Sequence, residues 1–149
     1  MQEFILWSNC TNQCDFCWQY RKHDANTILT PNEMIDSIYA TREKLNIIQN
    51  GDDVLLVGGE ILANYDDKVS NELHLLINDC IKRIKENKIR YFYVNTNLLF
   101  KDRKNLIYLL DAITGYESRL KFTTSFDIYG RFKTKELEKL FLDNLRFIH

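Results

Sequence analysis

The chain has 149 residues, of which 45% are hydrophobic and 28% are charged, as in ordinary soluble globular proteins. We expect one domain spanning residues 1–149, because this length is large enough for a hydrophobic core and most simply makes a single one. The formal net charge of −1 gives no electrostatic reason to expect nucleic acid or an anionic membrane as a partner, and the apolar runs are too short for a membrane span.

The first strand and helix flank a loop that is rich in cysteine. Residues 3–8 are expected to form a short buried strand, apolar on both faces as parallel strands are. Thr30-Pro31-Asn32-Glu33 predicts a helix start with a Thr N-cap, Pro at the first helical position and Glu in a capping box. Asn50-Gly51-Asp52 is expected to end this helix. Its predicted inner face consists of Met34, Ile35, Ile38, Tyr39, Leu45 and Ile48.

Three further strand–helix units follow in the same order. Strands are predicted over 54–57, 90–94 and 120–126, and helices over 69–87, over 102–113 and from a cap near Thr134. Four such repeats predict right-handed crossovers and a parallel sheet, so the expected fold class is α/β with about four β/α units. The inner faces of these helices are predicted to hold Val69, Leu73, Leu76, Ile77, Cys80, Ile81 and Ile84, then Leu106, Ile107, Leu110 and Ile113, and finally Leu137, Leu140, Phe141 and Leu145.

Unusual polar residues follow the end of each predicted strand. They are three cysteines after the first, Gly58-Gly59-Glu60 after the second, Asn95-Thr96-Asn97 after the third, and Ser125 with Asp127 after the fourth. The carboxyl ends of parallel strands meet at one edge, where α/β proteins bind ligands. The sequence therefore predicts a functional site at this edge.

The cysteine loop carries the most specific signal. Cys10, Cys14 and Cys17 are spaced C-x3-C-x2-C, so their thiolates can converge on one soft metal centre, either zinc or an iron–sulfur cluster. Three ligands leave one position open for something besides protein. A closed structural zinc site is the alternative, and it would need His23 as a fourth ligand. Disulfides fit poorly because the cysteines form no even, spread-out framework.

The spacing, with Phe16 just before the third cysteine, resembles the cluster loop of the radical S-adenosylmethionine (radical SAM) superfamily. The resemblance implies that Cys10, Cys14 and Cys17 hold a four-iron four-sulfur cluster whose open iron chelates the amino and carboxylate groups of SAM. It also implies that Phe16 packs beside the adenine.

Gly58-Gly59-Glu60 is identical to a motif common at the end of the second strand in this family, where it contacts the amino group of SAM. Glycines let a ligand approach the backbone closely, and a carboxylate can accept hydrogen bonds from an ammonium group. Ile61 stands where the family often has proline. The bland alternative is a turn that follows a strand.

The remaining rim residues resemble the family less closely. Asn95-Thr96-Asn97 is similar to its Thr-Asn-Gly triplet, with Leu98 in place of the glycine, and an Asn-rich turn is the alternative. The resemblance implies that Ser125 and Asp127 contact the ribose or the methionine carboxylate of SAM and that Arg131 pairs with that carboxylate.

The resemblance implies an oxidoreductase-type mechanism in which the reduced cluster cleaves SAM to methionine and a 5′-deoxyadenosyl radical. An unidentified substrate (peptide, protein or small molecule) and an electron donor are implied as partners. An activase that installs a glycyl radical on an enzyme such as anaerobic ribonucleotide reductase is a more specific alternative. A non-catalytic module with structural zinc is the third.

The resemblance covers essentially the whole chain, a partial barrel of four units where family cores usually have six. A minimal member, a truncated chain and one part of a larger polypeptide are all compatible with this length. The edge of the fourth strand would then need a cover, so we expect a homodimer or another partner there. Met1-Gln2-Glu3 lacks the start of a signal peptide, and we expect a reducing cytoplasm, which suits an oxygen-sensitive cluster.

Overall fold

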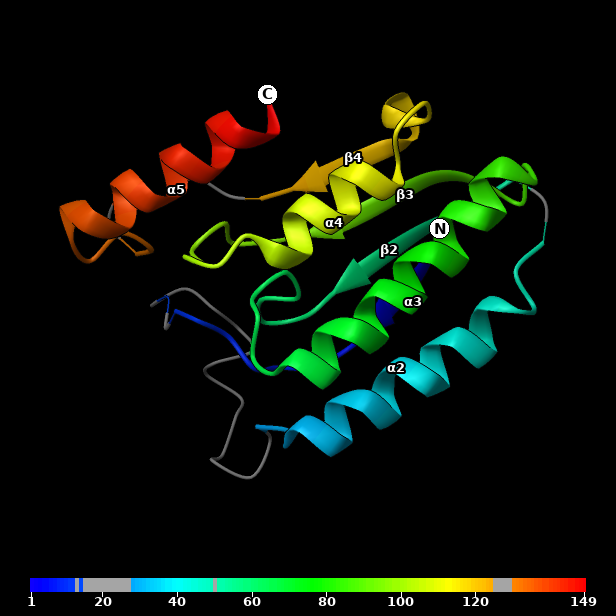
Figure 1. Ribbon diagram of the computed structural model, residues 1–149, viewed down its shortest axis with the longest axis horizontal. Coiled ribbons are helices and arrows are strands. Elements are labelled where there is room, and N and C mark those ends of the chain that lie inside the picture. Colours follow the sequence, from blue (N-terminus) through cyan, green and yellow to red (C-terminus); the bar gives the residue numbers. More distant parts are fainter. Residues whose placement is uncertain (13, 15–27, 50, 125–129) are drawn as a thin grey trace.

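The computed structural model describes residues 1–12, 14, 28–49, 51–124 and 130–149. Strands and helices alternate along these residues as predicted, and the strand order β1-β2-β3-β4 follows the order in the chain. Every pairing in the sheet is parallel, which confirms the α/β prediction (Figure 1). The strands are β1 (Gln2–Ile5), β2 (Asp52–Val57), β3 (Ile89–Asn95) and β4 (Leu120–Thr123). The helices are α2 (Pro31–Leu45), α3 (Asp67–Lys85), α4 (Lys104–Ala112) and α5 (Lys135–Ile148), and the 3₁₀ turn η2 (Glu117–Arg119) precedes β4.

Local sequence explains where the helices begin. Thr30 caps α2 in a full capping box with Glu33, and Thr134 caps α5, as both patterns predicted. Asp66 caps α3, so this helix starts slightly earlier than the periodicity indicated. Helix α2 ends at Leu45 and not near Asn50, because the next residues turn more tightly through i→i+3 hydrogen bonds, such as that from the N–H of Ile48 to the carbonyl of Leu45.

The core lies between the sheet and the helices α2, α3 and α4, which lie side by side on one face (Figure 1). Right-handed crossovers between neighbouring strands place all three helices on the same side. The whole predicted face of α3 is buried, including Cys80, which is a core residue as expected. None of the helices in the described residues is long and apolar enough to cross a membrane.

Two predicted core positions are wrong. Tyr39 of α2 is 46% exposed, because its hydroxyl lies beside Glu72 at the polar surface between α2 and α3. Ile107 of α4 is 43% exposed, whereas Leu109 is fully buried in its place. The face that α4 turns to the core is therefore rotated about the helix axis, away from Ile107 and toward Leu109.

The prediction of a first strand buried on both faces is also wrong. Gln2, Glu3 and Ile5 of β1 are exposed, because β1 is an edge strand that pairs with β2. Burial begins only beyond the strand, at Leu6 and Trp7.

Strand β4 forms the other edge of the sheet, as its predicted place in the strand order required. Phe122 is half-buried there and Lys121 is exposed. Helices α4 and α5 flank a groove of about 490 Å³ beside this strand, with apolar residues such as Leu110 and Leu145 in its lining. The expected fourth strand extended to residue 126, but β4 ends at Thr123 and residues 125–129 lie outside the described part of the chain.

Candidate functional site

The chain segments that leave β1 and β2 remain side by side beyond the sheet. The N–H of Leu6 donates to the carbonyl of Val57, that of Gly59 to the carbonyl of Trp7, and that of Glu60 to the carbonyl of Asn9, each at 2.9 Å. Parallel pairing therefore continues to the residue before Cys10. The backbone itself places the start of the cysteine loop against the Gly-Gly-Glu segment.

The two glycines make this close approach possible. A Cβ atom at Gly59 would lie 2.3 Å from the carbonyl oxygen of Asn9 and 2.4 Å from that of Ser8. A Cβ atom at Gly58 would lie 2.9 Å from the carbonyl oxygen of Trp7. The glycines thus let the chain's own backbone approach, where the sequence pattern pointed to the approach of a ligand.

Glu60 lies at the centre of the site with 0% of its surface exposed. Its carboxylate accepts hydrogen bonds from the Thr96 hydroxyl at 2.9 Å, from the N–H of Asn97 at 2.7 Å and from the N–H of Leu62 at 2.9 Å. No described lysine or arginine forms a salt bridge with it. Burial therefore raises the pKa of Glu60 from 4.5 to about 7, although these hydrogen bonds oppose the rise.

Amide groups donate to the two described cysteines of the loop. The Nδ2 of Asn97 lies 3.1 Å from the Sγ of Cys10, and the Nδ2 of Asn12 lies 3.2 Å from the Sγ of Cys14. Burial of its sulfur raises the pKa of Cys10 to about 11, opposed by a hydrogen bond from the Asn12 N–H and supported by the nearby acidic groups of Glu60 and Cys14. These groups therefore share one small volume at the carboxyl edge of the sheet.

Arg131 joins the same cluster from the segment after β4. It is 7% exposed, and its guanidinium donates to the carbonyl of Asn97 at 3.3 Å and to the Thr124 hydroxyl at 3.4 Å. Its own carbonyl accepts a hydrogen bond from the Nδ2 of Asn12 at 3.0 Å. Segments that follow all four strands thus meet in one hydrogen-bonded cluster, which we call the rim cluster: Cys10, Asn12, Cys14, Glu60, Thr96, Asn97 and Arg131.

Several predicted site residues lie elsewhere. Asn95 is a half-buried end residue of β3 whose backbone is paired with Thr123, and it is not part of the rim cluster. The others lie outside the described residues, so their predicted roles stay predictions: Phe16, Cys17, His23, Ser125 and Asp127.

The side chains of the rim cluster can be compared with the ligands that the predicted iron–sulfur cluster requires. No three His, Cys, Asp or Glu side chains gather as a metal site within the described residues, a set that includes Cys10 and Cys14 and leaves out Cys17. Thiol ligands that receive N–H hydrogen bonds at sulfur are the arrangement found around iron–sulfur clusters. The two described thiols are therefore compatible with a place among the ligands of a thiolate-bound cluster.

Three residues of the site were not identified from the sequence. Asn12 carried a readable signal, since it lies two residues from both Cys10 and Cys14. Tyr65 and Trp7 carried none: the Tyr65 hydroxyl lies 2.8 Å from the carbonyl of Asn9, and the indole N–H of Trp7 donates to the carbonyl of Glu60 at 3.3 Å. Both contacts fix backbone carbonyls next to the cysteines and at Glu60.

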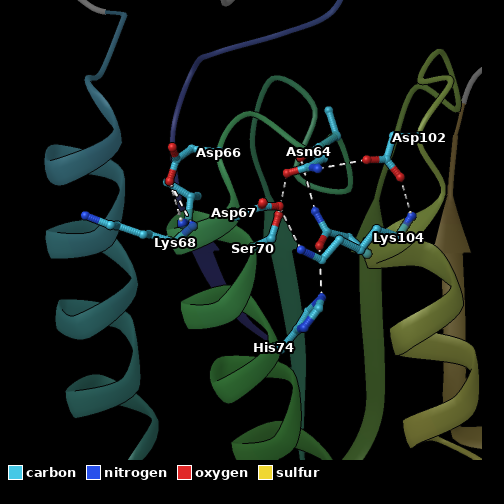
Figure 2. A network of polar contacts seen from close by, with 11 residues as sticks. Asn64, Asp66, Asp67, Lys68, Ser70, His74, Asp102 and Lys104 are labelled. Carbon is cyan, nitrogen blue, oxygen red and sulfur yellow. Dashed lines mark hydrogen bonds and ion pairs between the residues drawn. The ribbon is translucent and has the colours of Figure 1, made fainter.

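A second polar network joins the start of α3 to the start of α4 (Figure 2). The Ser70 hydroxyl donates to Asn64, and Asn64 donates to Asp102 at 2.8 Å. Asp102 also caps the N–H of Lys104, whose ammonium group pairs with Asp67 at 2.8 Å. We call these residues the outer network; it braces the two loops that follow β2 and β3.

Comparison with protein-family models finds no match for the chain, and neither a curated protein nor a solved structure matches it.

Proposed function

We propose that this protein is a radical SAM enzyme with a partial β/α barrel. The observation that carries the proposal is the rim cluster, in which Cys10, Glu60 and Asn97 are linked by hydrogen bonds. These residues come from three segments that each resemble the superfamily separately, and they are distant in sequence. Their convergence on one edge of a parallel sheet is what a shared cofactor site requires.

In this proposal Cys10, Cys14 and Cys17 hold a four-iron four-sulfur cluster. When bound, the cluster supplies an electron for the reductive cleavage of SAM, which starts radical chemistry on a substrate. SAM would lie against the rim, with contacts from the segment 58–60 and from residues that the resemblance implies: Phe16, Asn95, Ser125, Asp127 and Arg131.

The chain's own residues position the cysteine loop. Glu60 holds the backbone of Asn97 and Leu62, and Asn97 in turn contacts Cys10. The Glu60 side chain is enclosed and its oxygens are already hydrogen-bonded, so its role here is to hold this backbone in place. A direct contact between Glu60 and SAM stays a prediction.

The partners follow from the same chemistry. An electron donor must reach the cluster, and an unidentified substrate must reach the rim. A second copy or another chain would cover the edge of β4, beside the groove between α4 and α5. A reducing cytoplasm suits this oxygen-sensitive site.

The test compares two cysteine variants after anaerobic reconstitution with iron and sulfide. Cys14→Ala should lose the cluster because it removes a ligand, whereas Cys80→Ala should keep it because Cys80 lies in the core on α3. Iron analysis and electron paramagnetic resonance of the reduced proteins measure this, and the wild-type signal should change when SAM is added.

Full iron content in the Cys14→Ala variant would contradict the ligand assignment. A cluster signal that ignores SAM would contradict the cosubstrate. Tightly bound zinc without iron after anaerobic isolation would identify a zinc module.

A further inference from the structure

We infer that the side-chain amides of Asn97 and Asn12 set the reduction potential of the cluster by donating hydrogen bonds to its cysteine sulfurs. This inference rests on the proposed function and adds a tuning role for two residues that nothing else assigns. Asn97 serves Cys10, and Asn12 serves Cys14.

The contacts have the geometry of N–H···S hydrogen bonds. The nitrogen–sulfur distances are 3.1 Å for Asn97 and 3.2 Å for Asn12. The backbone N–H of Asn12 adds a longer contact of 3.5 Å to Cys10. Each of the two described cysteines of the loop thus receives a side-chain amide donor.

The orientation of the Asn97 amide is determined by its other contacts. Its Oδ1 accepts a hydrogen bond from the N–H of Leu99 at 2.7 Å, which leaves the Nδ2 group facing the sulfur. Its backbone N–H donates to Glu60, and its carbonyl accepts from Arg131. Asn97 is only 6% exposed, and its Nδ2 group also donates to the Thr11 hydroxyl, at the longer distance of 3.5 Å.

The orientation of the Asn12 amide is determined in a similar way. Its Nδ2 donates to the carbonyl of Arg131 at 3.0 Å as well as to Cys14, so each of its two hydrogens has an acceptor. The segment after β4 therefore holds Asn12 in place. Because that segment also contacts Asn97, one residue supports both donors.

The expected effect follows from electrostatics. Reduction adds negative charge to a cluster and its thiolates, and hydrogen bonds to sulfur stabilise the more negative state. Donors at Cys10 and Cys14 therefore raise the reduction potential and make the cluster easier to reduce. Their removal should lower the potential without removing a ligand.

The experiment measures the potential of the 149-residue chain after anaerobic reconstitution, by a redox titration followed with electron paramagnetic resonance. Asn97→Leu removes the donor without adding charge. At a fixed ambient potential its ratio of reduced to oxidised cluster should fall about tenfold, which is about 59 mV for a one-electron couple. Asn12→Leu should lower the ratio less, because Asn12 is half-buried whereas Asn97 is almost fully buried. Asn78→Leu is the matched control, since Asn78 lies on the surface and donates to Tyr108.

A second variant at the same position tests the inference if Asn97→Leu does not retain iron. Asn97→Ala removes the same donor without the bulk of leucine and without adding charge, so it should lower the potential in the same direction. If neither variant retains iron, Asn12→Leu decides the question.

The inference fails if a variant with full iron content has the wild-type potential, and the proposed function then still stands. A wild-type chain that takes up no iron overturns the proposed function and the inference together. The iron content of the wild type therefore separates the two failures.

Discussion

The rim cluster and the outer network differ in how far their acidic side chains are exposed to water. In the rim cluster, Glu60 is fully buried and its carboxylate is surrounded by uncharged donors. In the outer network, Asp67 has a side chain that is 80% exposed and pairs with the ammonium group of Lys104 (Figure 2). Both networks include residues that follow β2 and β3 and both are rich in hydrogen bonds, yet only the rim cluster excludes water from an acid.

This difference in exposure distinguishes the structural role of the outer network from the candidate functional role of the rim cluster. Hydrogen bonds and exposed ion pairs lower the pKa values of Asp67 and Asp102, so these acids stay charged at little cost. The pKa of Glu60 rises because burial opposes its charge. Groups whose pKa is shifted upward by burial in a cluster of convergent polar residues are typical of functional sites. The comparison therefore singles out the rim cluster as the candidate functional site.

The largest expected effect is on the backbone contact that builds the rim. Gly59→Ala would place a methyl group against the carbonyl oxygens of Ser8 and Asn9, and we expect it to lower the free energy of unfolding by about 3 kcal/mol or more. Gly115→Ala is the control, because Gly115 has a φ of +86° but no atom within 4 Å of the added Cβ, so only backbone strain of about 1–2 kcal/mol is expected. Urea unfolding measures both. If the two variants lower the free energy of unfolding equally, the segments after β1 and β2 can move apart at little cost.

The sequence predicted the order of elements and the edge where the site lies, because these follow from periodicity, helix caps and the rule that parallel strands end at one edge. It did not predict the exposure of Ile5, since an edge strand and a central strand have similar apolar composition. Cys10 and Glu60 were identified from local motifs.

Contacts between distant residues could not be read in this way. Asn12 meets the carbonyl of Arg131 across 119 residues of sequence. The enclosure of Glu60 depends on the backbone N–H groups of Leu62 and Asn97, which every residue except proline carries. Such contacts cannot be recognised from the types or spacing of the residues in the sequence.

The second prediction concerns the pH dependence of the buried acid. The pKa of Glu60 is about 7 in the folded protein, above its ordinary value of 4.5, so folding favours the protonated form. Its contribution to stability is fully present below pH 4.5 and is lost as the pH rises through 7. Relative to Glu60→Gln, the wild type should therefore lose on the order of 3 kcal/mol of unfolding free energy over this range.

The control for this measurement is a carboxylate with the opposite shift. Glu117 accepts a hydrogen bond from the N–H of Gly115, which lowers its pKa. Stability from Glu117 is therefore present at neutral pH and lost as the pH falls, so Glu117→Gln should show a difference of opposite sign. Urea unfolding at several pH values from 4 to 8 tests both variants. A pH-independent difference between wild type and Glu60→Gln would show that the carboxyl is not desolvated.

The smallest expected effect is in the outer network. Lys104→Ala removes the ion pair with Asp67 but keeps the hydrogen bond from the Lys104 backbone N–H to Asp102, which caps the start of α4. Because both charged groups remain well hydrated, we expect no detectable change in the urea midpoint, and iron uptake at the rim should equal that of the wild type. A loss of stability as large as that of Gly59→Ala would contradict this expectation. The outer network would then depend on its exposed charges, and the contrast between a hydrated outer network and a desolvated rim cluster would no longer distinguish the candidate site from the surrounding polar loops.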